Sequence, residues 1–275
     1  MSLILFKKFA NSPLRAAPDA GFGMIDAMRA HRAPLLTVLA ALLAGGGVMG
    51  ASAAPPFENS MAQRVLACTA CHGDQGRAGP DGYYPRLAGK PAGYLHHQLL
   101  NFRDGRRHYG LMTRMVDPLS DAYLLEIARH FSALELPYPP PAPVTAPPGL
   151  LRRGEALARQ GDAARGVPAC MQCHGTRLTG VAPDIPGLLG LPRDYLNAQL
   201  GAWQTQQRRA HAPDCMAQIA GRMDATDVSA VAAWLAAQPV PVPATPATVM
   251  PPTPPGAPRW RCGSAPAVQA AGERP

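Results

Sequence analysis

The stretches Cys68-Thr69-Ala70-Cys71-His72 and Cys170-Met171-Gln172-Cys173-His174 share the pattern Cys-x-x-Cys-His, the attachment signal for a c-type haem. Two residues between the cysteines put both sulfur atoms on one side of a helical turn. Each sulfur can then form a thioether with one porphyrin, and the adjacent histidine lies under the iron. One copy would also fit a zinc knuckle or a redox dithiol. Two copies in similar surroundings predict two covalent haem c groups. The expected cofactor-binding residues are Cys68, Cys71, Cys170 and Cys173, and the expected iron ligands are His72 and His174.

The sequence around the two motifs is duplicated. The segment PRLAG at residues 85–89 matches PGLLG at 186–190, and the YL…QL pattern at 94–99 recurs at 195–200. The offset between equivalent residues changes only from 101 to 104 along the chain, which small loop insertions explain. We therefore interpret the chain as an internal duplication of one single-haem domain.

The sixth iron ligand decides whether a haem can bind small molecules or only exchange electrons. Met112 follows His72 at nearly the same spacing as Met216 follows His174. A lone methionine usually fills a core, but these two stand at equivalent places in the repeats. Methionine is a soft ligand that favours ferrous iron. The pattern therefore predicts one His/Met haem in each repeat, with Met112 and Met216 as the distal ligands.

Other side chains remain open as distal ligands. Met115 lies one helical turn beyond Met112, although its counterpart in the second repeat is not a methionine. His108 and His211 shortly precede the two methionines. Cys215 is the direct neighbour of the second methionine.

Prolines and arginines of the repeat also suggest roles at the haems. A metal-bound histidine usually donates its second N–H to a carbonyl group. Pro85 and Pro186 follow the motif histidines at almost equal spacing, which suits loops that carry such carbonyls; a plain turn proline is the alternative. The arginines before the methionines could pair with haem propionates or simply end a solvated helix. They are Arg106, Arg107, Arg208 and Arg209.

The segment 1–54 is typical of an export signal. Basic residues precede a short apolar core at 35–44, and small residues follow and end in an A-x-A pattern at Ala53. A start at Met28 would give a leader of ordinary length. The core is shorter than the ~20 residues of a membrane-spanning helix, and an uncleaved anchor is the alternative. Export fits the motifs, because bacterial c-type haem is attached outside the cytoplasm, so we expect a periplasmic location.

The remaining chain is expected to form two domains, a linker and a tail. We predict cytochrome c domains over residues 55–135 and 150–238. The proline-rich linker 136–149 should act as a semi-rigid spacer. Residues 239–275 are rich in Pro, Ala and Thr, lack apolar periodicity and are expected to be disordered.

Three helices are expected in the first domain, over residues 57–67, 91–103 and 120–133. Ser120 is a suitable N-cap for the last of them. Its apolar stripe consists of Leu124, Ile127, Ala128 and Phe131.

The charge of the chain argues against a nucleic-acid partner, and its cysteine content suggests one disulfide. The net charge is +8, but beyond the segment 1–54 the excess of basic over acidic side chains is smaller, and the propionates of two haems would bring the total near zero. No basic cluster interleaved with aromatic residues suggests a nucleic-acid partner. Of six cysteines, only Cys215 and Cys262 lie outside the motifs. We predict that they pair, because an exported protein meets an oxidising environment.

Together these elements resemble the dihaem cytochrome c4 family of class I c-type cytochromes. The resemblance covers residues 57–238 and rests on Cys-x-x-Cys-His-Gly, Pro-x-Leu-x-Gly, Tyr-Leu-x-x-Gln-Leu and an arginine-rich segment before a methionine. It implies an all-α fold of two tandem class I cytochrome c domains, each wrapped round one covalent haem c and joined by the linker. His130 stands where the family usually has an aromatic residue between the terminal helices, whereas Trp234 keeps that position in the second repeat.

The resemblance also implies an electron carrier rather than an enzyme. Such a protein shuttles electrons between respiratory complexes of the periplasm through two His/Met haems. The implied redox partners are a quinol–cytochrome c reductase, a terminal oxidase or a dehydrogenase. Two alternatives remain: a dihaem enzyme of the peroxidase or thiosulfate-oxidising type, and a cytochrome subunit of a membrane dehydrogenase or oxidase, which would associate with the membrane.

Overall fold

The computed structural model describes residues 58–79, 81–141, 143–256 and 258–263. The expected leader and its cleavage site lie outside these residues. Both haem motifs fall within one compact unit that begins at Phe57. Within the described ranges, none of the helices has the length and apolar character needed to cross a membrane.

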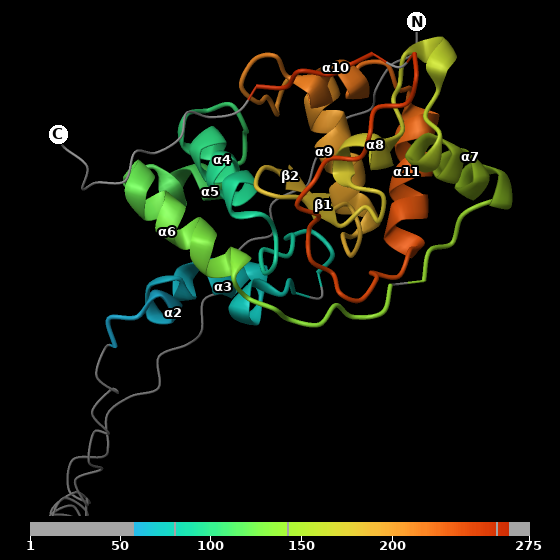
Figure 1. Ribbon diagram of the computed structural model, residues 1–275. Coiled ribbons are helices and arrows are strands. Elements are labelled where there is room, and N and C mark those ends of the chain that lie inside the picture. Colours follow the sequence, from blue (N-terminus) through green and yellow to red (C-terminus); the bar gives the residue numbers. More distant parts are fainter. Residues whose placement is uncertain (1–57, 80, 142, 257, 264–275) are drawn as a thin grey trace, which may run out of the picture. The chain divides into compact units, whose positions relative to one another are not determined.

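The first repeat is a set of short helices (Figure 1). They are α2 (Met61–Arg64), α3 (Leu66–His72), the 3-10 turn η1 (Asp74–Gly76), α4 (Ala92–Arg103), α5 (Gly110–Val116) and α6 (Asp121–Ser132). Ser120 caps α6 as predicted, with its side chain accepting a hydrogen bond from the backbone of Tyr123. The predicted stripe of α6 is buried, from Leu124 to Phe131. It forms the first core together with Leu95 of α4 and Val65.

The second repeat has the same order of helices, with a minimal hairpin added. Its elements are α7 (Pro148–Arg159), η2 (Ala163–Arg165), α8 (Cys170–His174), β1 (Gly180–Val181), β2 (Ile185–Pro186), α9 (Arg193–Gln204), α10 (Cys215–Ala220) and α11 (Ala225–Ala237). The strands β1 and β2 pair antiparallel and contain two residues each. The described part of the chain is otherwise helix and loop, so the all-α prediction is confirmed.

Helices α7 and α11 cross at Gly154. A Cβ atom at this position would collide with the carbonyl oxygen of Ala230 and approach the Cβ of Trp234 to 2.7 Å, so only glycine permits the contact. Trp234 is buried at this crossing, as the resemblance implied. Its counterpart His130 is only half-buried and stacks edge-on against Phe131.

Each repeat builds its own hydrophobic core. Buried residues between Leu157 and Leu235 form one cluster, and those between Val65 and Phe131 form two smaller ones. Two separate cores agree with two domains. The exact domain limits stay a prediction, although α7 begins at Pro148, shortly before the expected start of the second domain.

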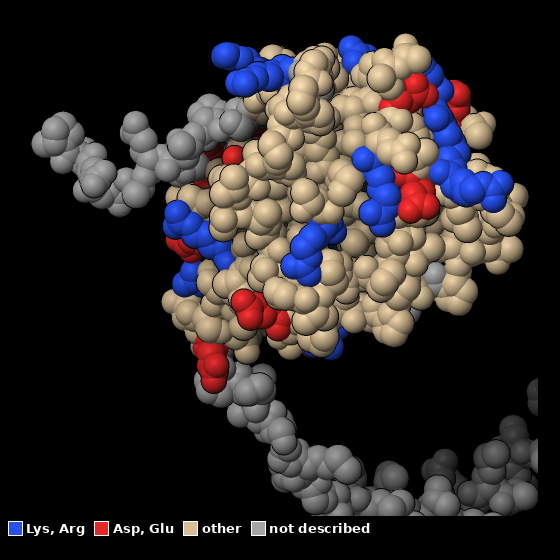
Figure 2. Space-filling view, turned by 45° about the vertical axis from the view of Figure 1, so that its right-hand side comes forward, with Lys and Arg blue, Asp and Glu red and all other residues tan. Residues whose placement is uncertain are grey.

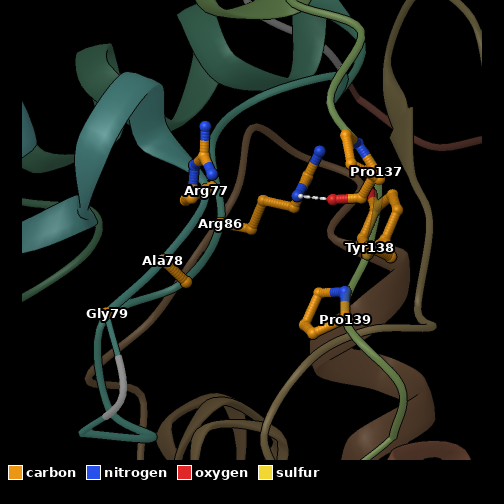
Figure 3. A pocket seen from close by; sticks show the side chains of 7 residues that line it. All are labelled: Arg77, Ala78, Gly79, Arg86, Pro137, Tyr138 and Pro139. Atoms are coloured by element: carbon orange, nitrogen blue, oxygen red, sulfur yellow. Dashed lines mark hydrogen bonds between the residues drawn. The ribbon is translucent and has the colours of Figure 1, made fainter.

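The first residues of the linker are fixed by an arginine. The guanidinium of Arg86 donates to the carbonyl oxygens of Leu136 and Pro137, at 2.5 and 3.1 Å, and lies 3.9 Å from the ring centre of Tyr138. Arg86, Pro137 and Tyr138 line a pocket, shown in Figure 3. Its volume is about 430 Å³. This part of the linker is therefore attached to the haem-motif loop of the first repeat rather than acting as a free spacer.

The expectation of a disordered tail is wrong for the described tail residues. Ala247 pairs with β1: its N–H donates to the carbonyl of Gly180 at 2.9 Å, and its carbonyl accepts from the N–H of Ala182 at 2.8 Å. The carbonyl of Thr245 accepts from the hydroxyl of Thr179. These backbone contacts hold the segment without an apolar stripe, which is why composition alone misjudged it.

The predicted disulfide between Cys215 and Cys262 is confirmed, with 5.4 Å between the two Cα atoms. Next to it, the N–H of Gly263 donates to the carbonyl of Pro213 at 2.9 Å. The bond joins the tail to the first residue of α10, directly before Met216.

Candidate haem sites and the polar cluster between the repeats

The two motif histidines are held in the same way. His72 ends α3 and His174 ends α8, and both are buried. The Nδ1 atom of His72 lies 2.8 Å from the carbonyl oxygen of Pro85, and that of His174 lies 2.8 Å from the carbonyl oxygen of Pro186. A carbonyl oxygen can only accept, so Nδ1 carries the proton and donates. The predicted role of the two prolines is thereby confirmed.

This arrangement leaves Nε2 of each imidazole with a free lone pair, which is the form that an iron atom binds. Burial lowers the pKa of both His72 and His174, although the bonds to the carbonyl groups oppose this effect. Both rings are therefore neutral near pH 7, and the donor chemistry fits an axial ligand of haem.

A glycine follows each histidine and turns the chain sharply. Gly73 has φ 74° and Gly175 has φ 84°, in the left-handed half of the backbone map. A Cβ atom at Gly73 would collide with the carbonyl oxygen of Ala78. The sixth residue of the Cys-x-x-Cys-His-Gly pattern is thus required for the loop that returns towards Pro85.

The four motif cysteines form no disulfide with one another. Cys71 is exposed, and the other three are partly buried. Burial raises the pKa of Cys170 to about 12 and also raises that of Cys68 and Cys173. A redox dithiol relies on a thiolate with a lowered pKa, so these thiols do not match that alternative. In the described residues, no three side chains of the His, Cys, Asp and Glu types gather as a metal cluster.

The candidate distal ligands lie on short helices after the arginine loops. Met112 is on α5 and packs against the core around Leu100, whereas Met115 is 45% exposed. Met216 is the second residue of α10 and is partly buried. His108 is exposed. Ligation through the methionines stays a prediction.

Arg107 and Arg208 meet between the two repeats. Their backbones form an antiparallel bridge. The side chain of Arg107 donates to the amide oxygen of Gln98 at 3.1 Å and to that of Gln199 at 2.6 Å. Arg208 donates to the same two oxygens, at 2.9 and 2.8 Å respectively. Equivalent residues of both repeats thus share one hydrogen-bond network.

Two tyrosines complete this cluster. Arg107 donates to the hydroxyl of Tyr195 at 3.0 Å, and Arg208 donates to that of Tyr94 at 3.4 Å. Both tyrosines belong to the duplicated Tyr-Leu-x-x-Gln-Leu pattern, in which tyrosine and glutamine lie about one helical turn apart on the same helix face. The sequence identified this pattern but gave no sign that it joins the repeats.

Within the part of the chain that the structure describes, the two buried guanidinium groups have no negatively charged partner. Arg107 is 9% exposed and Arg208 is 5% exposed, and among the described residues their partners are neutral oxygens. Burying a charge without a counter-charge is costly. Burial and the charge of Arg107 lower the pKa of Arg208. Haem propionates are carboxylates and would supply the missing charge, so the cluster fits the cofactor. The alternative of a solvated helix end is wrong for these two arginines.

Sequence reasoning missed charged and aromatic groups near the proximal histidines. The ring of Tyr84 lies edge-on to His72 at 6.1 Å, and its hydroxyl is 3.4 Å from that of Tyr109. Lys90 is buried and donates to the carbonyl of Gly187 at 3.1 Å. A difference between the repeats could have drawn attention to Lys90. A lysine directly follows the Pro-x-Leu-x-Gly segment in the first repeat, whereas a leucine follows it in the second.

No protein-family model matches the chain. The chain is 41% identical over 190 residues to the thiosulfate dehydrogenase electron acceptor of Thiomonas intermedia, a match that covers 69% of this chain and 83% of that protein. It is 31% identical over 200 residues to cytochrome c4 of Pseudomonas aeruginosa, or 72% of this chain and 96% of that one.

Solved structures that resemble this chain include a cytochrome c4 and a thiosulfate dehydrogenase. Reduced cytochrome c4 from Pseudomonas stutzeri matches 64% of this chain and 95% of its own, with a TM-score of 0.55 and 30% identity. A thiosulfate dehydrogenase from Marichromatium purpuratum matches 62% of this chain with a TM-score of 0.55 and 34% identity, and this chain spans only 36% of it. The chain belongs to the cytochrome c4 family of electron-transfer proteins, which carry two covalent haem c groups, one in each of two helical domains.

Proposed function

We propose that this chain is a periplasmic electron carrier, and not itself an enzyme, that accepts electrons from a thiosulfate dehydrogenase and delivers them to a respiratory acceptor. The main support is the paired geometry of the motif histidines, since both imidazoles present a neutral Nε2 and have the same kind of carbonyl partner. The 41% identity to a thiosulfate dehydrogenase electron acceptor points to the donor.

In this proposal each repeat holds its haem with the residues of the repeated motifs. Each bound haem c supplies a one-electron ferric/ferrous couple. The motif cysteines would anchor the porphyrins, and His72 and His174 would bind the irons through Nε2. Met112 and Met216 would supply thioether sulfur as the second ligands, which favours the ferrous state. Such closed coordination would leave no position for a substrate, in keeping with a carrier role.

The arginine cluster supports electron exchange between the two haems. Arg107 and Arg208 belong to different repeats but share the amide oxygens of Gln98 and Gln199. Propionates that pair with these arginines would bring both cofactors to one cluster and remove the cost of two unpaired buried charges. An electron that enters through either haem would then have a short route to the other.

The test is stopped-flow mixing of the oxidised dihaem protein with three solutions: thiosulfate alone, thiosulfate dehydrogenase alone, and both together. We expect rapid reduction of both haems only with both components. Reduction by thiosulfate alone would show that the chain is an enzyme. A rate with the dehydrogenase no faster than that of an unrelated c-type cytochrome would contradict this donor. Quinol–cytochrome c reductase is tested in the same way. Faster reduction by this enzyme than by thiosulfate dehydrogenase would identify a respiratory complex as the donor.

A further inference from the structure

We propose that Lys90 of the first repeat tunes the haem of the second repeat, where its buried ammonium group raises the reduction potential of the iron bound by His174. The inference rests on the proposed role of that histidine. Lys90 is a positioning residue in this scheme: it binds no cofactor and acts through the field of its charge.

The geometry places the ammonium group beside the proximal loop of the second repeat. Nζ of Lys90 donates to the carbonyl oxygen of Gly187 at 3.1 Å, and the side chain is 5% exposed. Gly187 directly follows Pro186, whose carbonyl oxygen accepts the hydrogen bond from His174. One peptide unit therefore separates the lysine's partner from the group that orients the proximal ligand.

No carboxylate of the described residues neutralises the charge of Lys90. Among the described residues it forms no ion pair with a carboxylate, and the charged group that acts on it is Arg86, which is also positive. Burial lowers the pKa of Lys90 to about 8, so the ammonium form still predominates near pH 7. Water screens a side chain buried this deeply only weakly, so its field extends further than that of a surface lysine. An added electron lowers the charge of the iron by one, and a nearby positive charge therefore favours the ferrous form.

The effect is confined to one repeat. The residue equivalent to Lys90 is Leu191, which carries no charge. Lys90 therefore acts on the second haem, and the uncharged Leu191 has no such effect on the first.

The experiment compares the dihaem wild type with Lys90→Met, which keeps an unbranched side chain of similar length and removes the charge. The midpoint potential of each haem is measured by spectroelectrochemical titration, with the haems distinguished by the methyl resonances of their porphyrins in NMR spectra. We expect the potential of the second haem to fall and that of the first to stay unchanged.

Arg129→Gln is the matched control. Arg129 is an exposed residue of α6 in the same repeat, so this variant removes one positive charge without removing the buried one, and both potentials should stay. Lys90→Gln provides a second neutral variant if Lys90→Met does not fold. Unchanged potentials in the neutral variant, or equal shifts of both haems, would overturn the proposal.

The readout is independent of the donor. A protein that thiosulfate dehydrogenase fails to reduce still has two measurable potentials, so the donor assignment and the tuning role can fail separately. The optical spectrum of each variant is also compared with that of the wild type. Identical spectra would show that the axial ligands are unchanged.

Discussion

Met112 and Met115 lie one turn apart on α5 but differ in burial. Met112 packs against the core, and Met115 is half exposed. We expect Met112→Ala to open one of the two irons, which removes about half of the methionine–iron charge-transfer band and allows carbon monoxide to bind the reduced protein. Optical spectra measure both effects. Met115→Ala is the control and should leave the spectrum intact; the reverse result would show that Met115 is the ligand.

The role of a residue could be predicted where both repeats have the same residue type at the same spacing. The spacing from motif histidine to proline predicted the 2.8 Å bonds to the carbonyl groups of Pro85 and Pro186, because a loop length that recurs in both repeats fixes a local contact. The role of Lys90 was not predictable. Its partner, Gly187, lies in the other repeat, and neither spacing nor composition relates the two residues.

At the scale of elements, the crossing of α7 and α11 depends on the absence of a side chain at Gly154. We expect Gly154→Ala to destabilise the protein by about 1–3 kcal/mol, because the added methyl group must push apart two packed helices. Gly149 lies on the same helix, and a Cβ atom there would meet only the guanidinium of Arg152 at 3.9 Å.

Gly149→Ala is therefore the matched control, with an expected change within about 0.5 kcal/mol. Urea unfolding followed by far-ultraviolet circular dichroism measures both variants. Equal stability of the two would mean that the helices can separate slightly at no cost.

Secondary-structure elements could be predicted where apolar residues recur at a regular spacing. The apolar stripe of α6 alone located its buried face, since an amphipathic helix has a period of about 3.6 residues. The tail has no such period. Its order comes from pairing with β1 and from the bond to Cys215, and both partners are distant in sequence. A proline-rich composition shows that a segment cannot form a helix or a core by itself. It does not show whether the segment binds to another part of the fold.

At the scale of the whole molecule, acid should weaken the fold through paired carboxylates. The guanidinium of Arg153 holds the pKa of Asp162 below its usual value, and the backbone N–H of Asp227 does the same for Asp224. Their folded pKa values lie below the unfolded ones. The stabilisation is therefore present above about pH 4 and is lost as the pH falls through the folded values.

We expect the urea midpoint of the wild type to fall between about pH 6 and pH 3 more than that of the double variant Asp162→Asn, Asp224→Asn. Asp117→Asn removes an exposed carboxylate that forms no ion pair among the described residues, so its midpoint should follow that of the wild type. Parallel curves for the wild type and the double variant would show that these two pairs do not contribute.

The duplication and the family were evident in the sequence, but the contact between the repeats was not. It depends on Gly93, where a Cβ atom would lie only 2.8 Å from the backbone carbonyl oxygen of Pro183, and on the hydrogen bond from the N–H of Tyr94 to the same carbonyl at 3.1 Å. Close approach of two backbones leaves little trace in composition. On the face seen in Figure 2, charged side chains of both signs are scattered, so local shape and not net charge should orient a partner.

The bond between Cys215 and Cys262 makes the order of assembly important. Six cysteines admit 15 complete pairings, yet the finished protein needs one disulfide and four sulfur atoms joined to porphyrin. Cys262 lies 47 residues beyond its partner and follows the five other cysteines in the sequence, so in the proposed export it would reach the oxidising compartment after them. Until it arrives, an oxidant would find Cys215 together with the four motif thiols. If the chain is exported as proposed, attachment of the haems must therefore outpace oxidation of the nascent chain, and conditions that reverse this order would yield mispaired protein without cofactor.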